Sequence, residues 1–249
     1  MLKVANNRSR EYTTSMGEYN KLLLEYIAKY PVRTYNKGEI IIFQGEAPRH
    51  TFIIKSGVVK AYNLSIHGDE KPVGFYKELD SFPGTWIYDK VPSAIYYYEA
   101  FTTNCTVYLV PKENYVNFIK TDLKMVLAEL DHYIDSQLAL SMQLNALQHS
   151  KANEKLMYTL HYLSITQGKV IGNNLREINL HLTHQDFANL TGLTRETAAT
   201  ELNKLKHLGV INYGKNQPYT INLEKLQLIL NDQYIAELEP GKEKETVLS

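Results

Sequence analysis

The sequence has little of what several classes of protein require. It contains one cysteine, Cys105, too few for a disulfide framework, a thiolate zinc site or an iron–sulfur cluster. Its 27 Lys and Arg balance its 27 Asp and Glu, so only a local basic face is left to attract nucleic acid. No apolar run approaches the roughly 18–20 residues that span a bilayer, and the N-terminus lacks the apolar region of a secretory signal. We therefore expect a cytoplasmic protein with no metal and no membrane partner.

The residue patterns of common enzymes are also missing. We find no paired carboxylates, nucleophile elbow or phosphate-binding glycine loop in a supporting context. His181 and His184 have a ligand-like spacing, but they fall at a predicted strand end and helix start, where structural or phosphate-facing roles are commoner. His50 or His67 as a lone haem ligand is disfavoured against a place on the surface. We expect no enzymatic activity.

What the sequence contains is a change of periodicity. Residues 18–30 have a helical pattern that stops at Pro31. From 32 to 111, short β-type runs separated by glycine turns indicate a small all-β barrel or roll. The runs lie at 39–44, 51–57, 57–64, 95–101 and 106–111.

A helical pattern without internal glycine or proline then runs from 112 to 149. Its apolar stripe has spacings of four, three and four, and other apolar residues lie off this stripe. Such a helix packs against two surfaces. We expect one to be the β-domain and favour a second copy of the chain as the other, the alternative being the rest of the same chain. The stripe is Leu123, Leu127, Leu130 and Ile134.

Residues 150–225 predict a winged helix-turn-helix. The pattern gives a helix at 151–166, a strand at 176–182, two short helices and a hairpin. A C-terminal helix and tail follow over 226–249, and residues 1–31 form an N-terminal helical segment. The fold class is therefore α+β.

The two short helices lie within 183–211. Thr183 is placed to cap the first, Gly192 gives the tight turn and Thr194 caps the second. This arrangement leaves Arg195 and Glu196 pointing outward at the first turn of the second helix. The residues spaced to face the core are Ala198, Leu202 and Leu205.

In a helix-turn-helix, the first residues of the second helix meet base edges in the major groove. Arginine matches guanine, and glutamate accepts from the cytosine amino group. The alternative is that Arg195 and Glu196 form an ordinary solvated turn, with the glutamate favoured by the helix dipole. The caps, hinge, core spacing and hairpin together favour DNA. Residues 181–215 carry four Lys and Arg against three Asp and Glu, so one copy should bind weakly and a dimer is favoured. The predicted phosphate contacts are Thr183, His184, Gln185, Thr194 and Thr197.

Four segments together resemble the CRP/FNR family of bacterial transcription regulators. The resemblance covers roughly residues 20–225. It implies a double-stranded β-helix (β-roll) sensor domain, a long dimerisation helix and a C-terminal winged helix-turn-helix. It also implies a homodimer on two-fold symmetric DNA, RNA polymerase as a partner and, more often than repression, activation. Arg195 and Glu196 match two of the family's base-reading positions. The segments are KGEIIIFQGE (37–46), TFIIKSGVVKAYNLSIHGDE (51–70), AFTTNCTVYLVPKENY (100–115) and LTHQDFANLTGLTRETAATELNKLKHLGVI (182–211).

Two departures from the family pattern matter. The third base-reading position, usually arginine, is Thr200, so the half-site should differ at that base pair. Nucleotide-binding members carry Gly-Glu in a phosphate cradle and then an arginine. Here Gly84 precedes Thr85, and no arginine lies between Arg49 and Arg176. A desolvated phosphate would lack a bidentate cation, which argues against a cyclic nucleotide.

The segment 79–101 is instead rich in aromatic residues. The family places its effector between the roll and the long helix, and an aromatic-lined cavity there would suit a small organic or aromatic molecule, as in members that respond to phenolic compounds. Equally open is a ligand-independent protein in which these rings are only core. A ligand-gated interaction protein that does not bind DNA is a further alternative. The hypothesised pocket consists of Phe82, Gly84, Trp86, Tyr88, Lys90, Tyr96, Tyr98, Tyr133 and Gln137.

Overall fold

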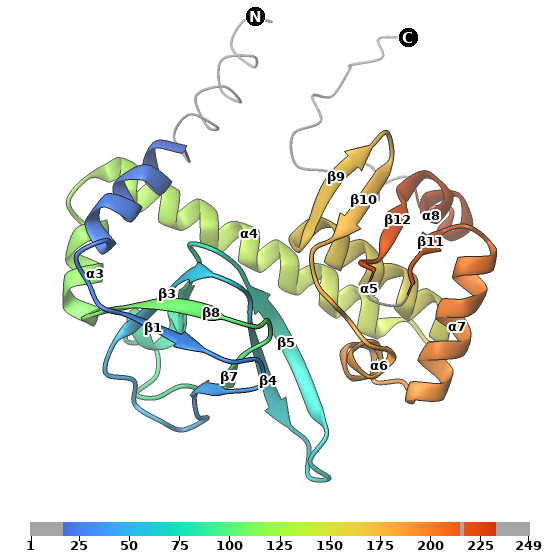
Figure 1. Cartoon of the computed structure of the whole chain (residues 1–249), viewed down its shortest axis with the longest axis horizontal. Helices are drawn as coiled ribbons and strands as arrows, with labels where there is room; N and C mark the ends of the chain where they lie inside the picture. Colours follow the sequence, from blue (N-terminus) through green and yellow to red (C-terminus); the bar gives the residue numbers. More distant parts are fainter. Residues whose placement is uncertain (1–16, 215–216, 233–249) are drawn as a thin grey trace, which may run out of the picture. The chain divides into compact units, whose positions relative to one another are not determined.

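The computed structural model describes residues 17–214 and 217–232, which form two compact units (Figure 1). The units divide within helix α4 (Leu123–Gln148), after Gln137. Over the described residues, no helix is both long enough and apolar enough to cross a membrane.

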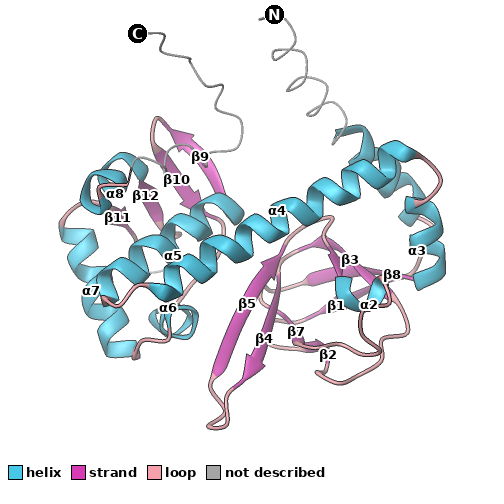
Figure 2. Cartoon of the chain, turned by 180° about the vertical axis from the view of Figure 1, so that it is seen from behind, coloured by secondary structure: helices cyan, strands magenta, loops and turns pink. Residues whose placement is uncertain are grey.

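The N-terminal unit contains two four-stranded antiparallel sheets, in the orders β1-β8-β3-β6 and β2-β7-β4-β5 (Figure 2). The β-type runs of the sequence correspond to β2, β3, β4, β7 and β8. Edge strand β5 was not predicted, because Pro72 and Gly74 argue against a strand. The strands are β1 (Val32–Tyr35), β2 (Ile40–Ile42), β3 (Thr51–Ser56), β4 (Val59–Leu64), β5 (Glu70–Tyr76), β6 (Ser81–Phe82), β7 (Tyr97–Ala100) and β8 (Cys105–Val110).

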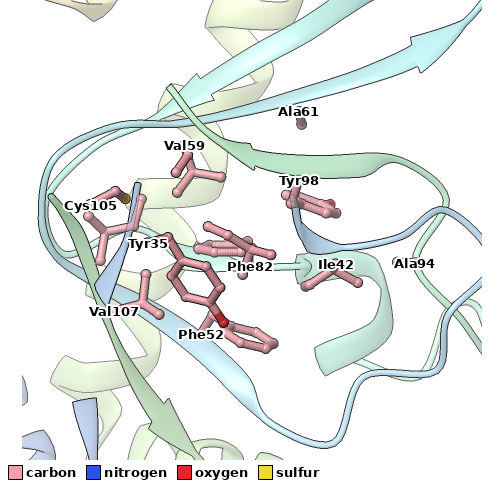
Figure 3. Close-up of a cluster of buried hydrophobic side chains, with 13 residues drawn as sticks. Tyr35, Ile42, Phe52, Val59, Ala61, Phe82, Ala94, Tyr98, Cys105 and Val107 are labelled. Carbon is pink, nitrogen blue, oxygen red and sulfur yellow. The ribbon is translucent and has the colours of Figure 1, made fainter. Parts of the chain in front are cut away.

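The main core of this unit lies between the two sheets (Figure 3). The Phe82 ring from one sheet stacks on Phe52 at 5.4 Å and on Tyr98 of the other sheet at 5.1 Å. Because side chains alternate along a strand, Tyr98 and Ala100 of β7 are buried, whereas Tyr97 lies on the opposite face and stacks on Tyr62. The alternation in the aromatic segment therefore directs every second ring into the roll.

A second apolar cluster joins helices to the outer side of β3 and β8. The helix over residues 17–27 buries Leu23 and Ile27, and α3 (Lys112–Ile119) buries Tyr115 and Ile119. The short helix α2 (Gly84–Ile87) adds its last residue to the same cluster. The cluster also contains residues from the first turns of α4, so this half of α4 is anchored to the roll.

The prediction of a single helix over 112–149 was wrong. The structure has two helices there, because α3 ends at Ile119 and α4 begins at Leu123. The Thr121 hydroxyl donates to the Phe118 carbonyl oxygen at 2.6 Å, and the Asp122 carboxylate accepts from the Lys124 backbone N–H at 2.9 Å. These two side chains satisfy backbone groups on either side of the break. Threonine followed by aspartate, rather than glycine or proline, separates the helices.

The C-terminal unit is a winged helix-turn-helix, as predicted, with a sheet of order β11-β12-β10-β9. Helix α8 begins before the predicted residue 226 because the Asn222 side chain accepts from the Lys225 N–H at 3.0 Å. The predicted tail from 233 onward and residues 1–16 of the N-terminal segment lie outside the described residues. The elements are α5 (Ala152–Thr166), β9 (Gly168–Gly172), β10 (Leu175–Ile178), α6 (His184–Thr191), α7 (Arg195–His207), β11 (Ile211–Asn212), β12 (Thr220–Asn222) and α8 (Leu223–Leu230).

Candidate nucleic-acid interface

Side-chain caps set the start of both helices in the helix-turn-helix. The Thr183 hydroxyl accepts from the Asp186 N–H at 3.2 Å, and the Asp186 carboxylate accepts from the Thr183 N–H at 2.7 Å, which completes a capping box on α6. Gly192 ends α6 with a φ of 70°, a left-handed conformation that favours glycine. Thr194 then accepts from the Thr197 N–H at 3.1 Å and caps α7. The predicted caps and hinge are confirmed.

Helix α7 has one buried side and one exposed side. Ala198, Leu202 and Leu205 are buried, as their spacing predicted. Arg195 and Glu196 are exposed at the first turn. Their positions follow from the cap at one end and the core spacing at the other, so a cation and an anion are fixed together at the start of the helix. Thr200, the third predicted base-reading residue, is also exposed.

The five residues predicted to contact phosphates lie at or beside the N-termini of α6 and α7, where free N–H groups and the helix dipole favour anions. Each already has a contact within the unit. The hydroxyls of Thr194 and Thr197 lie 2.9 Å apart, and the Gln185 amide donates to Asn189 at 2.8 Å. The His184 ring meets the Tyr213 ring edge-on at 6.0 Å.

Tyr213, which follows β11, lies against α7, and the sequence pattern did not single it out. Its hydroxyl donates to the Oδ1 atom of Asn203 at 2.8 Å. The Lys206 Nζ donates to the Tyr213 carbonyl oxygen at 2.6 Å and lies 4.6 Å from the centre of its ring. Burial raises the pKa of Tyr213 and keeps its phenol a donor. The only signal in the sequence was an aromatic residue near the end of the first strand of a predicted hairpin.

The hypothesised effector residues fall into separate groups. Phe82 and Tyr98 are buried in the core of the roll, and the partly buried Tyr96 packs against that core. Lys90 and Gln137 are exposed. The structure therefore does not bring these five side chains to one pocket wall.

The remaining four lie near one another on the side of the roll that faces α4. The Tyr88 and Tyr133 rings meet edge-on with their centres 5.7 Å apart. Trp86 and Tyr88 both pack against the second apolar cluster, which joins the helices to the outer side of β3 and β8. The Tyr133 hydroxyl lies so close to Gly84 that a Cβ atom added there would be 2.5 Å from it. The absence of a side chain at Gly84 lets α4 place a phenol beside α2.

Next to this group, Glu129 of α4 is a buried carboxylate that the sequence did not indicate. Tyr88 donates to it at 2.7 Å and Tyr19 at 3.0 Å, and Tyr115 donates to both its oxygens at 3.1 Å. Burial, and next the nearby charge of Glu129, raise the pKa of all three phenols above the usual value for tyrosine. Three hydroxyls from three segments of the chain thus satisfy one carboxylate on the long helix.

The four residues of the predicted dimer stripe are exposed along α4. Their exposed fractions are 71% for Leu123, 53% for Leu127, 54% for Leu130 and 55% for Ile134. Scattered single apolar residues are normal on protein surfaces, but a row of four on one helix face is a large exposed patch. Among residues 17–214 and 217–232, no group of three or more His, Cys, Asp or Glu is arranged to hold a metal ion.

Each of the two units matches a known protein family. Residues 32–122 match the cyclic nucleotide-binding domain family and residues 154–229 the Crp-like helix-turn-helix domain family. The HTH-type transcriptional regulator ArcR of Staphylococcus haemolyticus is 27% identical over 196 residues, which are 74% of this chain and 80% of that protein.

Two solved structures share the fold. FixK2 from Bradyrhizobium japonicum has a TM-score of 0.64 at 18% identity, over 86% of this chain and 99% of its own. A CooA mutant from Carboxydothermus hydrogenoformans has a TM-score of 0.66 at 20% identity, over 82% of this chain and 88% of its own. With a cyclic nucleotide-binding fold, a Crp-like helix-turn-helix and a regulator rather than an enzyme among its relatives, this chain belongs to the CRP/FNR family of DNA-binding transcription regulators.

Proposed function

We propose that two copies of this chain bind a two-fold symmetric DNA site, each with α7 in the major groove. The observation that carries this proposal is that α7 exposes Arg195 and Glu196 at its first turn while its opposite side is buried. Arginine can bond guanine O6 and N7, and glutamate can accept from cytosine. The two α7 helices would lie about 34–36 Å apart, one turn of DNA. Family membership supports RNA polymerase as a partner and activation as the more common outcome.

The test is the base preference of Arg195→Ala. The wild-type chain is first used to select binding sites from random DNA duplexes. The affinities of the wild type and of Arg195→Ala for these sites are then measured by mobility shift. The variant should lose about 1–3 kcal/mol of discrimination at one base pair in each half-site. Arg49→Ala, an exposed arginine of the N-terminal unit, is the matched control and should bind as wild type. Unchanged preference in Arg195→Ala would overturn the base-reading role of Arg195. A wild-type chain that selects no common site would favour an interaction protein that does not bind DNA.

For dimerisation, we propose that a second copy covers the exposed stripe of α4 that begins at Leu123. Its support is the row of exposed apolar residues and the weak local charge of one DNA-binding unit. A single unit makes few phosphate contacts, so two joined units gain affinity by multivalency. The stripe is also long enough to give both helices matching apolar surfaces.

For the N-terminal unit, we propose that a small organic or aromatic effector binds against Trp86, Tyr88 and Tyr133. The Tyr88 and Tyr133 rings meet edge-on, and the Tyr133 hydroxyl lies beside Gly84. Trp86 and Tyr88 pack against the second apolar cluster and not in the core between the two sheets. The lack of arginine between 49 and 176 speaks against a cyclic phosphate. The buried positions of Phe82 and Tyr98 are better explained by packing, which is what a ligand-independent family member would need.

Mass spectrometry of small molecules released from the purified protein tests this. The wild-type chain should retain a compound that Tyr133→Ala loses, because the variant removes one ring from the proposed wall. Tyr97→Ala, on the outer face of β7, should retain it. A wild-type chain that releases no compound, but still selects DNA sites, would establish the ligand-independent alternative.

A further inference from the structure

Asn203 lies in the same row of α7 as two of the predicted base-reading residues. Glu196, Thr200 and Asn203 are separated by four and three residues, which places them on one helix face, and all three are exposed. Asn203 therefore lies on the same surface as the first turn of α7, about one helical turn beyond Thr200.

The side chain of Asn203 is held by Tyr213. The phenol donates to Oδ1 at 2.8 Å, and it comes from the other side of the motif, after β11. Since an amide carries its oxygen and nitrogen on opposite sides, this bond turns the NH2 group of Asn203 away from Tyr213. The orientation of the amide is thus set by a neighbour and not left to the DNA.

Tyr213 is itself fixed in place. Its ring stacks on the buried Tyr219 at 4.5 Å with an interplanar angle of 24°, and His184 meets it edge-on. Lys206 bonds its carbonyl oxygen and lies over the ring. A phenol held on several sides keeps its hydroxyl at one point, so the amide of Asn203 has a fixed partner.

This arrangement restricts what Asn203 can recognise. Asparagine reads adenine by accepting from N6 through Oδ1 while it donates to N7. Here Oδ1 faces the Tyr213 hydroxyl, from which it accepts. A second lone pair remains on Oδ1, but the orientation that this bond sets leaves the NH2 donor as the group presented to DNA. Guanine offers acceptors at both N7 and O6, whereas adenine offers one acceptor at N7 beside the N6 amino donor, so an NH2 donor favours guanine.

We propose that Tyr213 is a positioning residue that makes Asn203 a donor-only reader of the major groove, selecting guanine over adenine at one base pair of each half-site. The inference rests on the proposed function, because it requires α7 in that groove. It supplies a further specificity position besides Arg195, Glu196 and Thr200.

The experiment selects binding sites from random duplexes with the full-length wild type, Tyr213→Phe, Asn203→Ala and Asn203→Asp. The wild type should prefer guanine at the base pair that responds to these variants. Tyr213→Phe frees Oδ1, so the preference for guanine over adenine should fall by about fivefold or more, the lower end of what one good base contact supplies. Asn203→Ala should abolish the preference there. Asn203→Asp presents an acceptor and should move the preference toward cytosine or adenine.

The possible outcomes distinguish the roles of Tyr213 and Asn203 from the proposed DNA binding. Circular dichroism and thermal unfolding first establish that each variant is folded. If Tyr213→Phe keeps the wild-type preference at every position, the positioning role is overturned. If Asn203→Ala weakens all sites equally, Asn203 contacts a phosphate and the reading role is overturned. If the wild type selects no common site at all, the proposed DNA function fails instead.

Discussion

At the scale of single residues, Thr183 and Thr194 are the N-caps that set where the two helices of the helix-turn-helix begin. Thr183 both donates to the Asp186 carboxylate at 2.7 Å and accepts from its N–H, so the cap is reciprocal. Losing a threonine cap costs about 1 kcal/mol, with a range of about 0.5–2 kcal/mol. We expect Thr183→Ala to lower the free energy of unfolding of the C-terminal unit by this amount in urea titrations. Thr200→Ala, in the interior of α7, should have no such effect, and equal losses in both variants would contradict a capping role.

At this scale, the sequence predicted the features that depend on neighbouring residues, but not the contacts between distant ones. The caps Thr183 and Thr194, the hinge Gly192 and the core spacing of α7 are local, and a local pattern predicts them. Tyr213 could not be connected to Asn203 in this way, because one lies after a strand and the other on a helix. The same holds for Tyr19 and Glu129, which are 110 residues apart.

At the scale of elements, the Glu129 cluster ties the N-terminal helix, the loop after α2 and α3 to α4. The sequence predicted these helical segments but not their junction, and it missed the break before α4 because a Thr121-Asp122 pair was not read as a helix end and start. Buried polar groups are stabilising only when they are satisfied. Three hydroxyl donors on one carboxylate meet that condition.

This cluster predicts a loss of stability in alkali. The phenols of Tyr19, Tyr88 and Tyr115 have raised pKa values in the folded chain, whereas an unfolded tyrosine titrates near about 10. The folded state therefore holds more protons than the unfolded state above that pH. The stabilisation is complete below about pH 10 and decreases as the pH rises further. Urea unfolding followed from pH 8 to 11 should show this decrease. Tyr115→Phe should be less stable at pH 8 but lose less with pH, and an unaltered pH slope would contradict the assignment.

At the scale of the whole molecule, a chain with no net charge must obtain DNA affinity from the placement of its charges and from the number of copies bound. In the proposed complex, each copy would attract phosphates and bases mainly through two helix N-termini and Arg195. Because contacts from two joined copies combine, dimerisation on α4 would convert weak half-site binding into specific binding.

Charge on the α4 stripe tests this dependence directly. Leu127→Glu combined with Leu130→Glu places two carboxylates on the exposed apolar face, where a dimer would have to bury them without partners. Sedimentation should give dimers for the wild type and single chains for this variant, while circular dichroism stays unchanged because both side chains are exposed in one copy. Binding to a two-half-site duplex should fall to the level of a single half-site. Ser136→Glu adds an exposed carboxylate to another face of the same helix and should leave dimers intact. If the double variant still sediments as a dimer, the second copy must pack on another surface. The distance between the two α7 helices would then be set by that other interface.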